Sequence, residues 1–234
     1  MQINLIGNHE LYNFDREQLK RRLHTARPGG HTDGAAREYY AVSPCAGWRF
    51  LVLDAYQDTV IRPERAVSHG ESLAPSEAAD HVRGLAILLA NNPNLHPDAI
   101  KGGSGWFDGL AGHDRRFVPF NGGFGAKQVA WLRGQLAAAA EGSERVVVLC
   151  HAILHPGACE GTTMAWDFEA ALAAIAEAPC GTVGVHARQR AAESCSGTFA
   201  LFFFVFFILQ ASLRSLGHWK TLFCWMLAAI VVPC

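Results

Sequence analysis

Uninterrupted apolar runs mark the strands that this sequence predicts. Residues 49–54 and 145–150 are apolar on both faces, which is the pattern of central strands in a parallel sheet. Two shorter segments, 3–6 and 39–42, also predict strands. Each run is bounded by polar or glycine-containing segments, so four strands are expected.

Helices are predicted where apolar residues recur at intervals of three and four. Asp15 with Gln18 forms a capping box for one helix, a second begins at Pro75, and two more cover about 126–140 and 166–178. The side chains expected to face the core are Leu19, Leu23, Val82, Leu85, Leu88, Leu89, Val129, Leu132, Leu136, Phe168, Leu172 and Ile175. Strands that alternate with helices predict an α/β sandwich.

The end of the chain breaks this alternation. Residues 199–209 and 221–234 are apolar runs that are each too short to cross a bilayer as a helix, and polar residues between them prevent a single span. We therefore divide the chain into a domain over 1–183 and a hydrophobic tail over 184–234. A tail that does not pack on the domain is the favoured interpretation, and a hairpin at a membrane surface through 199–234 is the alternative.

Charge and cysteine content restrict the class of protein. The formal net charge is −1, which leaves no basic surface for nucleic acid. Seven cysteines without a disulfide framework, and a first segment without a secretory signal, predict a cytoplasmic protein. Residues 91–125 form a long irregular stretch, which in a compact domain usually carries function.

Polar residues directly after the predicted strands are the candidates for chemistry. Gly7, Asn8 and His9 follow the first run, and they offer a tight turn, an amide oxygen for a hard cation and a proton donor. Asp54 and His151 follow two further runs. If these strands are parallel, all of these side chains share one edge of the sheet, where α/β proteins bind ligands. Taken singly, the first segment could be a polar turn after a strand, and His151 could be a polar residue with ordinary hydrogen-bond partners.

A zinc site is a rival interpretation of the same region. Cys150, His151, His155 and Cys159 place four ligands of the kinds that zinc accepts within ten residues. The spacing matches no zinc finger, and zinc would need all four side chains to converge.

Several segments together closely resemble one family. They are 7–14 (Gly-Asn-His-Glu-Leu-Tyr-Asn-Phe), 50–56, the Asn-Pro-Asn at 92–94, 116–124 with Gln128 and Trp131, and 148–156. Over roughly residues 1–180 and in the same order, they resemble the manganese-dependent ADP-ribose/CDP-alcohol diphosphatases, which are calcineurin-like metallophosphoesterases.

The resemblance implies a fold, a cofactor and roles for residues. The fold implied is a sandwich of β-sheets flanked by helices, with two Mn²⁺ ions at the strand ends. Asn8 and His151 match ligands of the second metal, and His9 matches the histidine that assists the leaving phosphate. Asn121 is expected to contact the substrate, and a structural role in the glycine-containing turn at 121–123 is the alternative. Asp54, which the shared strand edge marks, is also expected near the substrate. The implied reaction is hydrolysis of ADP-ribose to AMP and ribose 5-phosphate, and of CDP-alcohols.

The sequence also departs from the family's pattern. The Asp-x-His and Gly-Asp-x-x-Asp metal motifs of the family do not occur in the chain, and residues 181–188 do not match its Gly-His-x-His motif, for which His186 is a candidate substitute. We therefore expect an incomplete metallophosphoesterase domain with impaired activity. The alternative is a non-catalytic remnant or isoform that acts as a binding or membrane-associated protein.

Overall fold

The structure is a computed structural model of the chain. The structure describes residues 3–22, 39–63, 69–70, 72–96, 105–159, 161–179, 182–187 and 228–233. Leu23 and the run at 199–209 lie outside this part of the chain, as does most of the run at 221–234.

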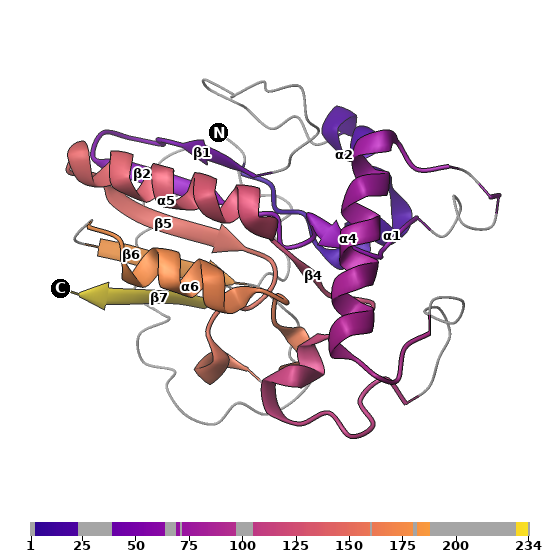
Figure 1. The fold of residues 1–234 in the computed structure, drawn as a ribbon. Coiled ribbons are helices and arrows are strands. Elements are labelled where there is room, and N and C mark those ends of the chain that lie inside the picture. The colour runs from indigo at the N-terminus through magenta and orange to yellow at the C-terminus, as the bar shows by residue number, and fades with distance from the viewer. Residues whose placement is uncertain are drawn as a thin grey trace, which may run out of the picture.

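A five-stranded mixed sheet organises the domain (Figure 1). Its strands are β1 (Tyr40–Val42), β2 (Trp48–Val52), β5 (Arg145–Cys150), β6 (Thr182–Ala187) and β7 (Ala228–Pro233), in the spatial order β1-β2-β5-β6-β7. β5 is parallel to both β2 and β6, whereas β1 and β7 pair antiparallel. The prediction that the apolar runs form parallel strands is thereby confirmed for β2 and β5.

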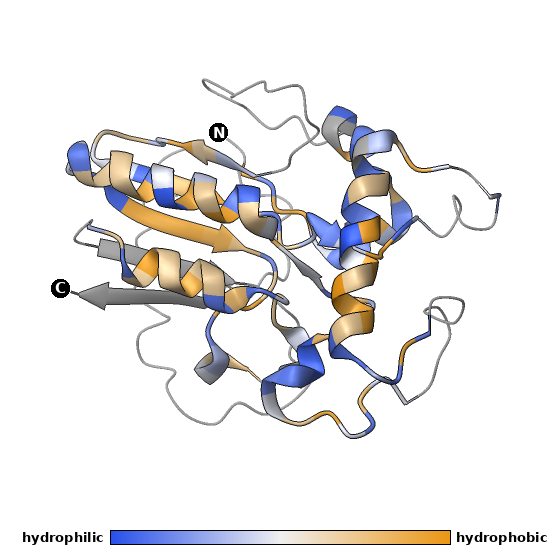
Figure 2. Ribbon diagram, viewed as in Figure 1, coloured by the Kyte–Doolittle hydropathy of each residue, from blue (hydrophilic) through white to orange (hydrophobic). Residues whose placement is uncertain are grey.

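Two helices cover one face of this sheet. α5 (Gly125–Glu141) and α6 (Phe168–Ala176) lie side by side over it in Figure 1. Figure 2 shows β5 as a continuous hydrophobic strand beneath these helices. The core there is made by buried residues of all three elements, namely Leu132, Leu136, Ala139, Val146, Val148, Cys150, Phe168, Ala171 and Ala174.

A smaller unit stands beside the C-terminal ends of the strands. The short strands β3 (Asp58–Thr59) and β4 (Gly122–Gly123) pair antiparallel, and α4 (Pro75–Asn91) packs on β3. The irregular stretch between α4 and α5 also contains the short 3₁₀ helix η1 (Gly112–Arg116), and η2 (Pro156–Ala158) and η3 (Gly161–Thr163) follow β5.

Most predicted core positions are confirmed, but Val82 is not. Its side chain is 65% exposed, although the apolar spacing placed it inward. α4 contacts β3 through Gly84, where an added Cβ would lie 2.7 Å from the Thr59 nitrogen, and through the buried Leu88 one turn later. Residues two apart on a helix do not share a face, so Val82 points away from the surface that Gly84 presents.

The predicted strand at 3–6 is also wrong. This segment enters no sheet, and the N–H and C=O groups of Asn4 bond instead to the Tyr40 hydroxyl, at 3.1 and 3.0 Å. A main chain that bonds to a side chain in this way forms no ladder with β1. Two short helices follow, α1 (Asn8–Asn13) and α2 (Arg16–Arg22). The predicted capping box is confirmed, since Asp15 Oδ1 accepts from the Gln18 amide at 2.6 Å.

The last described residues join the sheet. β7 pairs antiparallel with β6 over six residues, from Thr182 opposite Pro233 to Ala187 opposite Ala228. β6 itself crosses the boundary that we placed between residues 183 and 184. The division into a domain and a separate tail stays a prediction. In the described part of the chain, no helix has both the length and the apolar character needed to cross a bilayer.

Candidate functional site

The carboxyl ends of β2 and β5 form the edge at which the candidate residues gather. The two strands run in register, with Val52 opposite Leu149, and the Leu53 amide extends the ladder by donating to the Leu149 carbonyl at 2.8 Å. Asp54 and His151 therefore leave neighbouring parallel strands at the same edge, as the sequence predicted.

Gly7 brings the N-terminal segment against His151. A Cβ atom built on Gly7 would lie 2.4 Å from His151 Cε1 and 2.6 Å from its Nδ1, so only glycine allows the main chain to come this close to the imidazole. Asn8 is the next residue and begins α1, and it is buried. The main-chain segment that carries Asn8 is thus in direct contact with His151.

Tyr56 lies at the same edge and contacts His151. Its side chain is buried, and its ring centroid is 5.8 Å from that of His151. Burial raises the pKa of Tyr56 well above its ordinary value, so the phenol is neutral at physiological pH.

His9 differs from these residues because it is exposed to solvent. Its ring meets the edge of the Tyr12 ring at a centroid distance of 5.7 Å, and its carbonyl accepts from the Asn13 side chain at 2.7 Å. α1 therefore buries Asn8 and presents His9 outward, where a dissolved substrate can reach the imidazole.

Asp54 is held by partners within the protein. Its carboxylate is 2% exposed, and it accepts from Arg16 Nη1 at 2.6 Å through Oδ2 and from the Tyr56 amide at 2.9 Å through Oδ1. The Gln128 side chain bonds to both the N–H and the C=O of Asp54, at 2.8 and 2.9 Å. Substrate contact by Asp54 stays a prediction, and what the geometry shows is a carboxylate that shapes the turn after β2.

Asn121 is also buried, and its side chain ties two loops together. Nδ2 donates to the carbonyls of Arg116 and Thr162, at 2.9 and 2.8 Å. The Asn121 carbonyl accepts from the Thr59 hydroxyl at 3.2 Å. Both amide hydrogens are therefore used inside the fold, and a substrate contact by Asn121 stays a prediction.

The zinc interpretation is wrong. All four of its residues are described, and the described part of the chain holds no group of three or more His, Cys, Asp or Glu side chains that could bind a metal ion. Cys150 points into the core, where burial raises the pKa of its thiol, and His155 is exposed and accepts from the Gly157 amide through Nδ1.

The same observation limits what the described residues offer to Mn²⁺. An amide oxygen from Asn8 and an imidazole from His151 are suitable ligands, and Gly7 brings their segments together. Two ligands do not complete a site, because a hard divalent ion takes about six. The described residues thus supply two suitable ligands for Mn²⁺ but not a complete metal site. Any further ligands from this chain would come from outside them, for example from the His186 side chain, which is not described.

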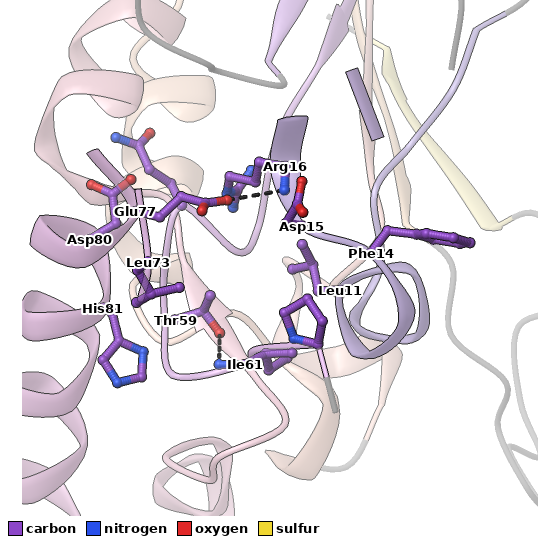
Figure 3. Close-up of a pocket in the computed structure, with 12 residues that line it drawn as sticks. Leu11, Phe14, Asp15, Arg16, Thr59, Ile61, Leu73, Glu77, Asp80 and His81 are labelled. Atoms are coloured by element: carbon purple, nitrogen blue, oxygen red, sulfur yellow. Dashed lines mark hydrogen bonds between the residues drawn. The ribbon is translucent and has the colours of Figure 1, made fainter. Parts of the chain in front are cut away.

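A pocket lies between the N-terminal helices and α4, and Arg16 is one of the residues that line it (Figure 3). Leu11, Phe14, Thr59 and Ile61 line it together with polar residues of α4, and the Arg16 backbone amide donates to Glu77 at its rim. Asn8, His9 and His151 are not among its lining residues. The pocket therefore lies apart from the candidate metal ligands.

Comparison with known proteins relates the fold to an enzyme family. The chain is 34% identical over 175 residues to a manganese-dependent ADP-ribose/CDP-alcohol diphosphatase of Danio rerio and 32% identical over 180 residues to one of Oryza sativa. These alignments cover 72% and 76% of the chain. This chain is homologous to the manganese-dependent ADP-ribose/CDP-alcohol diphosphatases. The resemblance inferred from the sequence motifs is confirmed.

A solved structure supports the same relationship. The crystal structure of a dimetal phosphatase from Danio rerio superimposes with a TM-score of 0.58 at 31% identity, covering 74% of this chain and 49% of that one. No family model matches the sequence. The chain spans about half the length of the diphosphatases that it matches.

Two residues that hold Asp54 at this edge could not be assigned to it from the sequence. Arg16 is one of several basic residues in α2, and nothing in its neighbourhood marks it as the buried partner of Asp54. Gln128 stands in the diphosphatase-like segment, but its two bonds to the Asp54 backbone depend on how α5 crosses the end of β2. Only the fold brings these distant residues to Asp54.

Proposed function

We propose that this chain supplies part of a metal-dependent hydrolase of nucleoside diphosphate linkages, acting on ADP-ribose and CDP-alcohols. The observation that carries the proposal is the contact of His151 with Gly7, directly before Asn8, in a chain homologous to the diphosphatases. From ADP-ribose the products would be AMP and ribose 5-phosphate. The architecture proposed is the calcineurin-like sandwich. The three free cysteines of the described residues support a reducing, cytoplasmic environment.

Each residue of the edge has a task in this proposal. Asn8 and His151 would hold Mn²⁺, which when bound activates water and neutralises charge on the phosphate. The exposed imidazole of His9 would donate a proton to the leaving phosphate, a contribution of about 10²–10⁴-fold. The packed turn formed by Gly7, Asp54 and Tyr56 would keep the two ligands in place.

The reaction gives the first test of the proposal. The chain is expected to release AMP from ADP-ribose only when Mn²⁺ is present, and at least about 10²-fold more slowly than a full-length diphosphatase, because two described ligands fix a metal loosely. The measurement is chromatographic quantification of AMP at increasing Mn²⁺, with the two proteins at equal concentration.

Variants make this test specific. His151→Ala should abolish the residual activity, whereas His155→Ala should leave it unchanged because His155 is exposed and bonds only locally. Efficient cleavage of a simple phosphomonoester with ADP-ribose untouched would contradict the proposed substrate class. Equal activity of wild type and His151→Ala would contradict the proposal that residues at the carboxyl ends of β2 and β5 take part in the reaction.

A further inference from the structure

We propose that Arg115 binds a phosphate group of a nucleotide, and that the aromatic loop over residues 105–120 holds its guanidinium in position to do so. The inference rests on the proposed function for the class of ligand, which is the nucleoside diphosphate or its nucleotide product. It involves no metal ion. The loop belongs to the irregular stretch between α4 and α5, which has no other role in the proposed reaction.

Two asparagines that follow α4 fix the shape of the aromatic loop. Asn92 is 1% exposed, and its Nδ2 donates to the carbonyls of Trp106 and Phe117, at 3.0 and 2.7 Å. Asn94 Nδ2 donates to the carbonyl of Asp108 at 2.7 Å. Because these bonds join both halves of the loop to the end of one helix, the side chains that the loop carries keep their relative positions.

Three aromatic rings of the loop pack on one another, and Arg115 lies over one of them. The Phe120 ring contacts those of Trp106 and Phe107, at centroid distances of 6.0 and 6.4 Å. The central carbon of the Arg115 guanidinium lies 4.9 Å from the centre of the Phe107 ring. Stacking on a ring orients the guanidinium, so it loses less freedom when a ligand binds. All four side chains are partly exposed, and a dissolved ligand can therefore reach them.

Arg115 differs from its neighbour Arg116 in the use of its hydrogen-bond donors. Arg116 is buried and donates to two main-chain carbonyls and to Glu169. Within the described part of the chain Arg115 makes no hydrogen bond or ion pair, and even its buried Nε meets no acceptor. The carboxylate of Asp114 lies 3.7 Å from Arg116 instead. A guanidinium presents its N–H groups as a planar fork that matches a phosphate, so Arg115 is suited to bind one.

The aromatic loop packs on the segment that leads away from His151. Asn121 directly follows the loop, and its Nδ2 donates to the Thr162 carbonyl in η3 at 2.8 Å. An added Cβ at Gly161 would lie 2.2 Å from the Gly112 carbonyl oxygen, so the two main chains are in close contact. The rings beside Arg115 favour a ligand that joins a phosphate to a flat base, because bases stack on aromatic side chains.

The experiment measures AMP binding to the full chain without metal, by isothermal titration in the presence of a chelator. Arg115→Gln should bind AMP at least about tenfold more weakly than wild type, because the charge-assisted bonds to the phosphate are lost. Arg115→Lys keeps the charge without the planar fork and should fall between the two. Arg21→Gln is the matched control, since Arg21 is an exposed arginine of α2 and its loss should not change AMP affinity.

Three further titrations separate the parts of the interaction. Adenosine lacks the phosphate, so Arg115→Gln should bind it as wild type does. Inorganic phosphate lacks the base and should bind wild type about tenfold more weakly than AMP. Phe107→Leu removes the ring beneath the guanidinium and should weaken AMP binding by about two- to fivefold. Unchanged AMP affinity in Phe107→Leu would overturn the role given to the loop.

The outcomes distinguish this inference from the proposed function. If wild type binds no AMP, or both Arg115 variants bind it as wild type does, the inference is overturned, whereas Mn²⁺-dependent release of AMP from ADP-ribose still decides the proposed function. If Arg115→Gln loses AMP affinity and the chain hydrolyses no nucleotide, the inference stands and the proposed function fails. An equal loss in Arg21→Gln, or inorganic phosphate that binds as tightly as AMP, would overturn the assignment of Arg115 to a nucleotide.

Discussion

Replacing Arg16 with methionine is expected to lower the free energy of unfolding by about 3–5 kcal/mol. The Arg16–Asp54 pair is almost fully buried, and removing the guanidinium leaves the Asp54 carboxylate charged and unpaired in the interior. The Tyr56 carbonyl loses its donor at the same time. Urea denaturation followed by tryptophan fluorescence would measure the change.

The matched control for this prediction is Arg21→Met. Arg21 lies on the same helix but is exposed, so its loss should change stability by less than about 0.5 kcal/mol. The double variant Arg16→Met, Asp54→Leu removes both charges and should recover part of the loss. Equal stabilities of the Arg16 and Arg21 variants would show that the buried pair does not hold the turn.

Gly7→Ala is expected to destabilise the protein by about 1–3 kcal/mol and to abolish Mn²⁺ binding. The added methyl group would meet the His151 ring at 2.4 Å, so the imidazole or the main chain before Asn8 must move. A displacement of about 1 Å at a functional site is enough to cost about 10²-fold in function. Thermal unfolding and Mn²⁺ titration on the same sample would measure both effects.

Gly134→Ala provides the control for the effect of adding a methyl group. A Cβ at Gly134 meets no atom within 4 Å, and the residue lies inside α5, so alanine there should stabilise the protein by about 0.4–1 kcal/mol. In the His151→Ala variant, Gly7→Ala should lower the free energy of unfolding by less than in wild type, because the imidazole ring that the methyl group clashes with is absent. If Gly7→Ala destabilises the His151→Ala variant as much as it destabilises wild type, the added methyl group does not act through the His151 ring.

The sequence predicted the sheet edge better than the segment that approaches it. β5 and the central part of β2 follow directly from apolar runs, because a strand buried on both faces tolerates no polar interruption. Residues 3–6 include the polar Asn4 and form no strand, and the N–H and C=O groups of Asn4 bond to the Tyr40 hydroxyl, a contact that no local pattern encodes. Asn8 reaches the edge through the close approach at Gly7 and not through a strand end.

The roles of buried polar residues were harder to predict than their positions. Asp54 was expected at the edge and is found there, but its bonds to Arg16 and Gln128 come from helices distant in sequence. Val82 shows the same limit on a helix, because the apolar spacing did not reveal that Gly84 would make the contact. Hydrophobic periodicity shows which face of a helix is apolar. Tertiary contacts decide which face packs against the rest of the protein.

The parallel pairing of β2 with β5 has a consequence for how the protein folds. It aligns Trp48 with Arg145, and most of the described chain, including α4 and α5, lies between these two residues. Closing so long a loop costs entropy before any contact across the pair compensates it, which makes such pairings late and slow events. Asp54 and His151 come to the same sheet edge only after that step. The appearance of Mn²⁺ affinity during refolding should therefore lag behind the formation of α5, whose contacts are local.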